Sequence, residues 1–407
     1  MLDGGIFALS GVIGLWFASV LLRDGVRPGW PTLLLLAFWV FFSYLVLPRL
    51  HRILTSIYLP AYFVGRTRTS DGLLGDPVNL GFLGRSSQVH GAMTRAGWAR
   101  ADALSVRSAA GIVRGVLTRR SYAGAPVSPL HLFGRPQDFA YEQEVAGTPR
   151  QRHHIRFWRC PDGWLLPGGF RSDWLAAASF DRGVGLSWFT LQFTHRVDED
   201  TDAERDLVVS EVCRSVPGVR VAVIERFSSG YHHRNGGGDR IQTDGDLPIL
   251  DLRRAPAGDA PGTVARPVLD DPSRGRAAEV PGVVWLGAGV ALARSATYGL
   301  GAVLVAVERS ATTLVVAVLV LAVCEGSLAV AVLLGSNWAR LLLAAGCTVT
   351  ALTAMTVAIV GHQRPIGIAQ LLTVGGSVLV LLALSHPQAR DYAVGRHAGA
   401  RWATATP

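Results

Sequence analysis

The chain has 407 residues, 49% of them hydrophobic, and a formal net charge of +9 from 39 basic and 30 acidic side chains. Every basic residue is an arginine, which a GC-rich genome explains more simply than selection for phosphate binding. No basic-aromatic module typical of nucleic-acid binding is present, so we expect no nucleic-acid partner. The four cysteines show neither CxxC nor Cys/His zinc spacing, which argues against a disulfide framework.

Two groups of apolar runs, each of bilayer-spanning length, bracket a charged central region. They cover residues 4–22 and 31–48, and then 283–307, 312–334, 338–361 and 366–385. The first run lacks the basic start and small-residue cleavage site of a signal peptide, so we expect it to stay as an anchor. The pattern predicts a multi-pass protein of the plasma membrane whose first partner is the lipid bilayer.

Composition divides the chain into five parts. They are a transmembrane hairpin with an interfacial segment (1–65), a soluble domain (66–254), a Pro/Gly-rich linker (255–281), a four-helix transmembrane bundle (282–387) and a C-terminal tail (388–407). Residues 49–68 mix arginines with aliphatic and aromatic residues, which is typical of a segment at headgroup level. The basic charge favours anionic lipid headgroups as a further partner.

The arginines near the span ends are distributed unevenly between the two sides of the membrane. One side would hold Arg49, Arg52, Arg274, Arg276, Arg340, Arg390, Arg396 and Arg401, and the other Arg23, Arg27, Arg309 and Arg364. The positive-inside rule therefore predicts that the soluble domain and both termini are cytoplasmic. Because long domains translocate largely regardless of charge, a domain on the outer side is the alternative.

The soluble domain begins with helical spacing and then changes to a period of two. Helices are predicted at 86–98, with Ser86 as N-cap, at 103–117 and at 202–215; strands are predicted at 137–144, 152–159, 173–180 and 184–197 and near 220–227 and 247–252. This order predicts an α+β domain, an antiparallel sheet with helices, inserted between two and four transmembrane helices.

Two histidines fall at defined positions of the predicted strands. In 152–159, His153 falls on the same side of the strand as Ile155 and Phe157. In 187–197, His195 continues the apolar face of the strand. Both should therefore lie at the edge of an apolar sheet face, where Asp181 at the end of the preceding strand can join them. Two histidines and an aspartate can hold a divalent metal or act as general acid and base. The alternative is that each is a core histidine bonded to the backbone or to a buried acid.

The acid run at 198–202 matches neither of two known motifs. A calcium loop needs glycine where Ala203 stands, and the aspartate-nucleophile phosphatase box does not fit either. A capping box explains the run better, with Thr201 as N-cap and Glu204 at N3, and Arg205 is expected to pair with one of the acids.

Three acids share one face of strand 137–144. Asp138, Glu142 and Glu144 are expected to form ion pairs with Arg135, Arg152 or Arg156, and metal ligation is the less favoured interpretation.

Two charged residues lie inside predicted spans. Arg294 stands 14 residues before the short turn at 308–311, and Glu325 stands 14 residues after it. At 1.5 Å per residue both fall about 21 Å from the turn, at one depth. Buried charges in a span are costly and tend to pair, so we predict an Arg294–Glu325 ion pair, structural or part of a substrate path.

Several segments of the soluble domain resemble the LssY C-terminal domain family over about residues 69–254. They are GDPVNLGFLG (75–84), AGW (96–98), PVSPLHLFGRPQDFAYE (126–142), RHHIRFWR (152–159), ASFDRGVGLS (178–187), THRVDEDTDAERD (194–206) and TDG (243–245). The resemblance implies a domain of uncharacterised activity that often accompanies DedA-type membrane segments or phosphatidic-acid-phosphatase type 2 domains. The chain lacks lysine and the PSGH motif, so the site of those lipid phosphatases is absent.

Two hypotheses for function follow. The first is a membrane-anchored accessory module that binds lipid headgroups or an envelope partner. The second is a membrane-associated hydrolase of a phosphoester or lipid-linked substrate that uses His153, His195 and Asp181, with a divalent metal as the conceivable cofactor. A transporter or secretion component is a third interpretation, against which six spans without a repeat argue.

Overall fold

The computed structural model describes residues 2–58, 65–101, 127–145, 151–228, 233–257, 280–308, 312–360 and 367–394. The chain forms two compact units, one made of residues 1–50 and 269–407 and the other of residues 51–268. The predicted helix at 103–117 and most of the predicted linker lie outside the described residues.

The first unit is helical. Its elements are α1 (Leu2–Gly25), η1 (Trp30–Thr32), α2 (Leu33–Phe41), the π-helical η2 (Phe42–Val46), the start of α3 (Leu47–Tyr58), α7 (Gly282–Glu308), α8 (Thr312–Leu333), α9 (Asn337–Val360) and α10 (Ile368–Leu384). Within the described residues, five helices are long and apolar enough to cross a membrane, and a sixth if the bent pair Ile368–Leu384 and Pro387–Val394 counts as one span. The second of them extends from Trp30 to Ile57, beyond the predicted 31–48.

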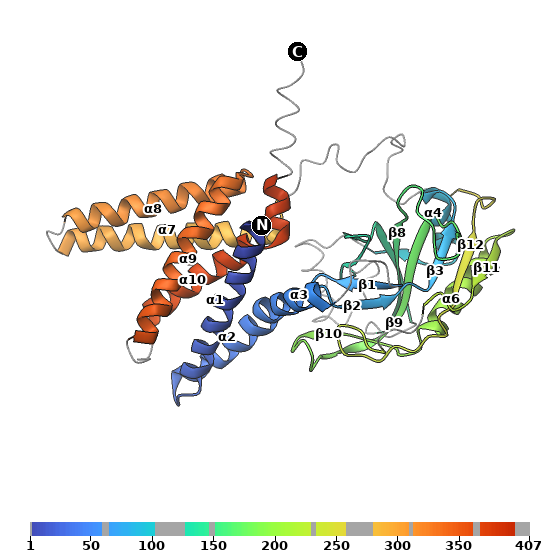
Figure 1. Cartoon of the computed structure of the whole chain (residues 1–407), viewed down its shortest axis with the longest axis horizontal. Coiled ribbons are helices and arrows are strands. Elements are labelled where there is room, and N and C mark those ends of the chain that lie inside the picture. Colours follow the sequence, from blue (N-terminus) through green and yellow to red (C-terminus); the bar gives the residue numbers. More distant parts are fainter. Residues whose placement is uncertain are drawn as a thin grey trace, which may run out of the picture. The chain divides into compact units, whose positions relative to one another are not determined.

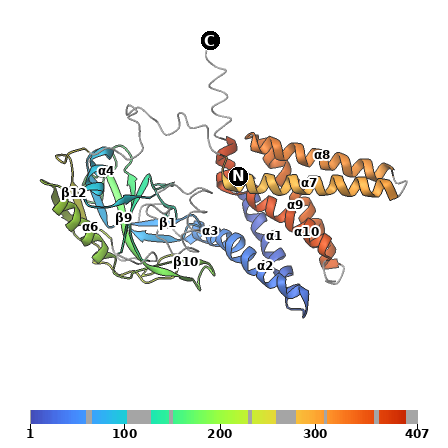
Figure 2. The same cartoon turned by 180° about the vertical axis from the view of Figure 1, so that it is seen from behind.

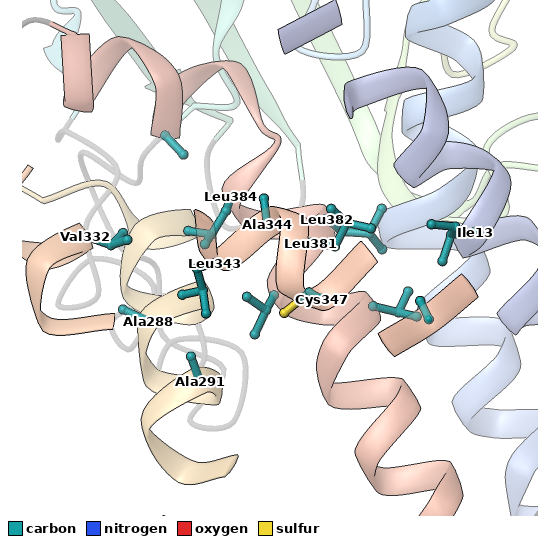
Figure 3. Close-up of a cluster of buried hydrophobic side chains, with 14 of the residues drawn as sticks. Ile13, Ala288, Ala291, Val332, Leu343, Ala344, Cys347, Leu381, Leu382 and Leu384 are labelled. Atoms are coloured by element: carbon teal, nitrogen blue, oxygen red, sulfur yellow. The ribbon is translucent and has the colours of Figure 1, made fainter. Parts of the chain in front are cut away.

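Small side chains allow these helices to pack closely, and α7 and α8 run side by side (Figures 1 and 2). Ala288 and Ala291 of α7 lie in one buried cluster with Leu343 and Ala344 of α9 (Figure 3). A Cβ at Gly287 would come within 2.8 Å of the Leu384 side chain, so α7 and α10 approach through a glycine. Small residues at such interfaces let apolar helices pack tightly where the surroundings are equally apolar.

The start of the predicted C-terminal tail is helical instead. Residues Pro387–Val394 form a helix bent by 59° from α10. Tyr392 is buried, and its hydroxyl donates to the carbonyl of Leu333 at 2.6 Å. The sequence predicted a tail from residue 388, but Ala389 and Tyr392 belong to the buried cluster of the bundle.

The second unit contains two sheets. The strands are β1 (Arg66–Thr69), β2 (Leu74–Pro77), β3 (Leu80–Leu83), β4 (Ala99–Arg100), β5 (Leu130–Leu132), β6 (Arg135–Pro136), β7 (Phe139–Glu144), β8 (Arg152–Arg159), β9 (Trp174–Leu186), β10 (Phe193–Val197), β11 (Arg220–Ile224) and β12 (Leu247–Asp251). The larger sheet has the order β11-β12-β3-β9-β8-β7-β4 with β10 added to β9, and the smaller has the order β2-β1-β5-β6. The domain is α+β as predicted, but its sheet is mixed, since β12 and β3 are parallel.

The larger sheet is covered on both faces, and side chains that alternate along each strand enter two different cores. Helices α4 (Ser86–Arg95) and α6 (Thr201–Ser215) cover one face, where Ile155 and Phe157 of β8 are buried. The smaller sheet covers the other face, where Trp158 of β8 packs near Leu130 of β5. Figures 1 and 2 show α4 and α6 on the side of β9 opposite to β1.

Two predictions about the strands were wrong. The sequence placed a break at residues 181–183, but β9 continues through them to Leu186 and the chain turns at 187–192 instead. Strands β1, β5 and β6 of the smaller sheet were missed, and part of β1 falls in the segment predicted to be interfacial. Strands of two to four residues carry too little alternation to be recognised, whereas the apolar run at 187–193 imitates a strand.

Candidate functional site

Strand β8 brings three polar side chains to the face that the smaller sheet covers. Each of them meets a carboxylate from a different strand. The pairs are Arg152–Glu142 of β7 (3.2 Å), His154–Asp181 of β9 (2.9 Å) and Arg156–Asp76 of β2 (2.9 Å). All three acids are buried, so this face contains a polar layer beside the apolar cluster that holds Trp158 and Leu130.

Asp181 lies between two imidazoles. Its Oδ2 is 2.9 Å from His154 Nε2 and 3.1 Å from His195 Nδ1. Asp181 and His154 are buried, whereas the side chain of His195 is 55% exposed. Burial alone would raise the pKa of Asp181, but the two imidazoles hold that pKa well below its usual range. The carboxylate therefore stays ionised and can orient the exposed imidazole of His195.

A β-bulge brings His195 onto the face of Asp181. In the β9–β10 ladder Asp181 stands opposite Val197, but the next pairs are Gly183 with Arg196 and Val184 with His195. One extra residue of β9 is thus accommodated between these pairs, which changes the side-chain parity of one strand relative to the other. The sequence predicted that His195 and Asp181 meet, and the structure brings them together through this irregularity.

The expectation that His153 joins them is wrong. His153 projects to the helix-covered face, where its Nδ1 is 2.7 Å from Oε2 of Glu204 in α6. Its ring also lies against Trp98 and Phe180. Because β9 does not break before Asp181, Asp181 stands opposite Arg152 and shares the face of His154. Burial raises the pKa of Glu204, and the neighbouring His153 partly offsets that rise.

The start of α6 is capped by a residue other than the predicted one. Asp200 is the N-cap, and its Oδ1 accepts from the backbone N–H groups of Asp202 (3.1 Å) and Ala203 (3.0 Å). The predicted cap, Thr201, lies inside the helix and donates its hydroxyl to the carbonyl of Gln242. The Glu204 carboxylate contacts His153 instead of completing a capping box. At α4 the predicted cap Ser86 is likewise the first helical residue.

Arg205 joins the acid run to the TDG segment. It contacts Asp202 (3.2 Å), Asp206 (2.8 Å) and Asp244 (2.6 Å), which confirms its predicted pairing with the acids. Gly245 allows the sharp return of the chain here, since it has a φ of +84° and a Cβ would lie 2.1 Å from the carbonyl oxygen of Ser228. The acid run is therefore structural: it ties the N-terminus of α6 to a loop.

Two of the three acids of 137–144 form predicted ion pairs. Asp138 pairs with Arg135 at 2.6 Å and Glu142 with Arg152, while Glu144 stands opposite Arg152 in the ladder. Arg156, the third predicted partner, turns instead to the smaller sheet.

Sequence reasoning missed the residues that hold β9 in place. Asp76 accepts from Arg156 and also from the hydroxyl of Ser179 at 3.0 Å. Asn79 exchanges two hydrogen bonds with the backbone of Ala178, at 3.0 and 2.9 Å, and donates to the carbonyl of Thr201. The available signal was the polar GDPVN stretch before an apolar strand, which is unusual for a core segment.

The described residues do not gather a metal site. Among them, no three His, Cys, Asp or Glu side chains come close enough together to hold an ion. His154 Nδ1 is buried and has no hydrogen-bond partner within the described chain, and one carboxylate oxygen is shared by both imidazoles. The geometry suits proton transfer at His195 better than metal ligation.

In the helical unit, the structure brings Arg294 and Glu325 together. Arg294 Nε is 3.4 Å from Glu325 Oε1, and both side chains are largely buried. The guanidinium also lies 3.3 Å from the hydroxyl of Tyr298 and 3.6 Å from Cys347 Sγ. A Cβ at Gly376 would come within 2.8 Å of the Arg294 side chain, so a glycine of α10 makes room for it.

The comparison with known families concerns the second unit. Residues 56–247 match the family described as LssY C-terminus. No curated protein and no solved structure matches the chain. The matched segment contains the polar layer of β8, the Asp181–His195 pair and the Arg205 cluster. The domain formed by residues 56–247 therefore belongs to the LssY C-terminal domain family.

Proposed function

We propose that the chain is a multi-pass protein of the plasma membrane with its LssY C-terminal domain and both termini in the cytoplasm. The five or six helices of spanning length and composition among the described residues support membrane insertion. The excess of arginine at the span ends on the side of the domain supports the orientation.

The exposed thiol of Cys213 in α6 provides a test of sidedness, because Cys160 and Cys347 are buried. A Cys324→Ala variant leaves Cys213 as the reactive thiol among the native four. A membrane-impermeant maleimide should fail to label intact cells and should label them after lysis. Labelling of intact cells at the lysed level would place the domain outside.

We infer that the domain is a hydrolase of a phosphoester or lipid-linked substrate, with His195 as general base. The observation that carries this is the ionised, buried Asp181 beside the exposed imidazole of His195. A carboxylate at Nδ1 favours the tautomer whose Nε2 accepts a proton, and it stabilises the imidazolium that forms.

In this proposal His195 acts first as general base and then as general acid, and the other side chains support it. His195 Nε2 takes a proton from the attacking water, and the same imidazolium then protonates the leaving oxygen. Asp181 orients the ring, and His154 contacts the same carboxylate from the buried side at 2.9 Å. Arg182 and Arg196, both exposed on the same hairpin, supply positive charge for an anionic substrate.

The test uses full-length protein in nanodiscs with phosphatidic acid and an aryl phosphate ester as substrates. His195→Gln should lower kcat by at least about 100-fold, the usual range of general-base catalysis. His153→Gln is the matched control on the opposite face and should keep its activity. Hydrolysis that survives in His195→Gln, or none in the unmodified protein, would refute the assignment.

The second candidate function is an accessory module that binds anionic lipid headgroups without chemistry. The observation that favours it is the exposure of Arg182 and Arg196 on a hairpin that has no acid between them. With the full-length protein embedded in nanodiscs, photocrosslinking of the domain to phosphatidylglycerol that is lost in Arg182→Gln/Arg196→Gln, together with no hydrolysis, would select this function.

A further inference from the structure

The turn between β9 and β10 presents large aromatic side chains to the outside. Trp188 is 81% exposed and Phe189 is 55% exposed. These are unusual fractions for aromatic side chains in a domain that buries so many others. Residues 187–192 are called the hairpin tip below.

Hydrogen bonds and buried flanking residues fix the conformation of the hairpin tip, and this conformation keeps its aromatic side chains exposed. Ser187 and Thr190, on either side of the two aromatics, are buried. The Ser187 hydroxyl donates to the carbonyl of Gly237 at 2.7 Å and accepts from the Thr190 N–H at 3.2 Å. Leu191 adopts a φ of +55°, a left-handed conformation that non-glycine residues adopt only when the surroundings impose it.

The hairpin tip is tied to the helix that continues the second candidate span. The ring of Phe189 stacks on that of His51, with centroids 5.0 Å apart and planes 3° apart. His51 belongs to α3 and lies within the span Trp30–Ile57. Farther along α3, Leu54 and Ile57 are also exposed. Leu54 is three residues from His51 and therefore on the same side of the helix.

Charge and residue type at the hairpin tip fit the membrane–water interface. Between Arg182 and Arg196 the hairpin contains no Asp or Glu. Tryptophan concentrates at the headgroup level of bilayers because its ring is both apolar and a hydrogen-bond donor. Arginine on the flanking strands is attracted by anionic headgroups.

We propose that the hairpin tip is a membrane anchor, in which Trp188 and Phe189 insert into the headgroup region of an anionic bilayer beside α3. The occupant of this apolar surface is lipid, because the span that contains His51 brings the surface to membrane level. The anchor rests on the proposed membrane insertion and is independent of the proposed chemistry. His195 lies two residue pairs beyond the Leu186–Phe193 pair, about 7 Å along the ladder, so the anchor holds it near the headgroup layer.

Spin-label accessibility in full-length protein tests this anchor. The four native cysteines are replaced (Cys160→Ala, Cys213→Ser, Cys324→Ala, Cys347→Ala) and single cysteines are introduced by Trp188→Cys, Val320→Cys and Val223→Cys. Val320 lies on α8 and Val223 on β11, and both are more than half exposed, as a lipid-facing and a water-facing control. The measured quantity is the ratio of collisions with oxygen to collisions with a polar nickel chelate. In phosphatidylglycerol-containing nanodiscs this ratio should be severalfold higher at position 188 than at position 223.

The outcomes separate this inference from the proposals it rests on. Lipid-type accessibility at 320 with water-type accessibility at 188 would overturn the anchor and leave membrane insertion standing. Water-type accessibility at 320 would overturn both. Dipolar broadening at 188 that disappears on dilution with unlabelled protein would overturn the lipid assignment in favour of a second copy of the chain. Circular dichroism of each variant confirms that the labelled protein is folded.

Discussion

Buried ion pairs hold both units of this protein, but they are built differently. In the helical unit Arg294 and Glu325 approach to 3.4 Å, and within the described chain neither facing atom makes a hydrogen bond. In the LssY C-terminal domain Arg156 donates to Asp76 at 2.9 Å, and Asp76 also accepts from Ser179. The two members of the helical pair thus approach without a hydrogen bond between their facing atoms, although Arg294 donates to Tyr298 and Cys347, whereas the domain pair is one part of a hydrogen-bonded layer.

The difference shows why one pair was predictable and the other was not. A helix advances by a constant rise, so equal distances from a turn set Arg294 and Glu325 at equal depth. The rise along a strand does not predict contacts between sheets. The partner of Arg156 depends on which sheet covers β8. Removing one member of each pair should therefore have different consequences.

The largest effect is expected in the domain. Asp76→Ala leaves the Arg156 guanidinium buried without its carboxylate and should lower the free energy of unfolding by about 3–5 kcal/mol. The double variant Asp76→Leu/Arg156→Met should recover much of that loss, because neither charge of this pair is then left buried without the other. Amide hydrogen exchange of β8 and β9 in the full-length protein measures the loss in the single variant and the recovery in the double variant. As control, Asp162→Ala removes an exposed partner of Arg159 and should cost at most about 1 kcal/mol.

The helical pair should respond less strongly. Glu325→Gln leaves Arg294 unpaired in the span, at a cost of about 2.5–3.5 kcal/mol for a charge near the bilayer centre. Reversible unfolding in mixed detergent and SDS micelles measures the change. If the pair is real, Glu325→Gln/Arg294→Met is less destabilised than Glu325→Gln alone. Equal losses would show that the two side chains do not interact.

A neutral histidine gives the domain a pH dependence. His90 of α4 is buried with Nδ1 2.6 Å from the Tyr141 hydroxyl, and burial, with help from Arg100, lowers its pKa to about 4. The unfolded chain binds this proton from about pH 6.5 downwards, so stability is complete above pH 6.5 and falls as the pH approaches 4. The loss should be about 1–2 kcal/mol, since nearby solvent screens part of the effect.

Unfolding of the full-length protein at pH 7 and pH 5 measures this dependence. His90→Gln should remove most of the difference between the two values. An unchanged difference in His90→Gln would assign the pH dependence to another group.

The smallest effect concerns the cap of α6. Asp200→Ala should cost about 1 kcal/mol, because two N–H groups lose their acceptor, and Asp200→Ser should restore most of it. Hydrogen exchange in the first turn of α6 reports the change. Glu199→Ala, one residue earlier, is the control and should leave that exchange unaltered.

Much of the secondary structure of the LssY C-terminal domain could be predicted from the sequence. Strand 152–159 was predicted at its observed bounds because its alternation is long. Helix 202–215 was predicted within one residue because it has a clear polar start. The alternation of 152–159 correctly placed His153 on the face of the apolar residues of that strand. What failed was the choice of the face that Asp181 joins, because it depended on where β9 ends.

The sequence by itself determined the apolar helices, the α+β domain between them, the family of that domain and the depth of the Arg294–Glu325 pair. These follow from composition, period and helix rise, which are local properties of the chain. Only the tertiary structure decided that His154 rather than His153 shares Asp181 with His195, that Asp76 holds Arg156, and that Phe189 stacks on His51 of α3. Those facts depend on strand register, on one bulge and on a second sheet, where a shift of one residue moves a side chain to the opposite face.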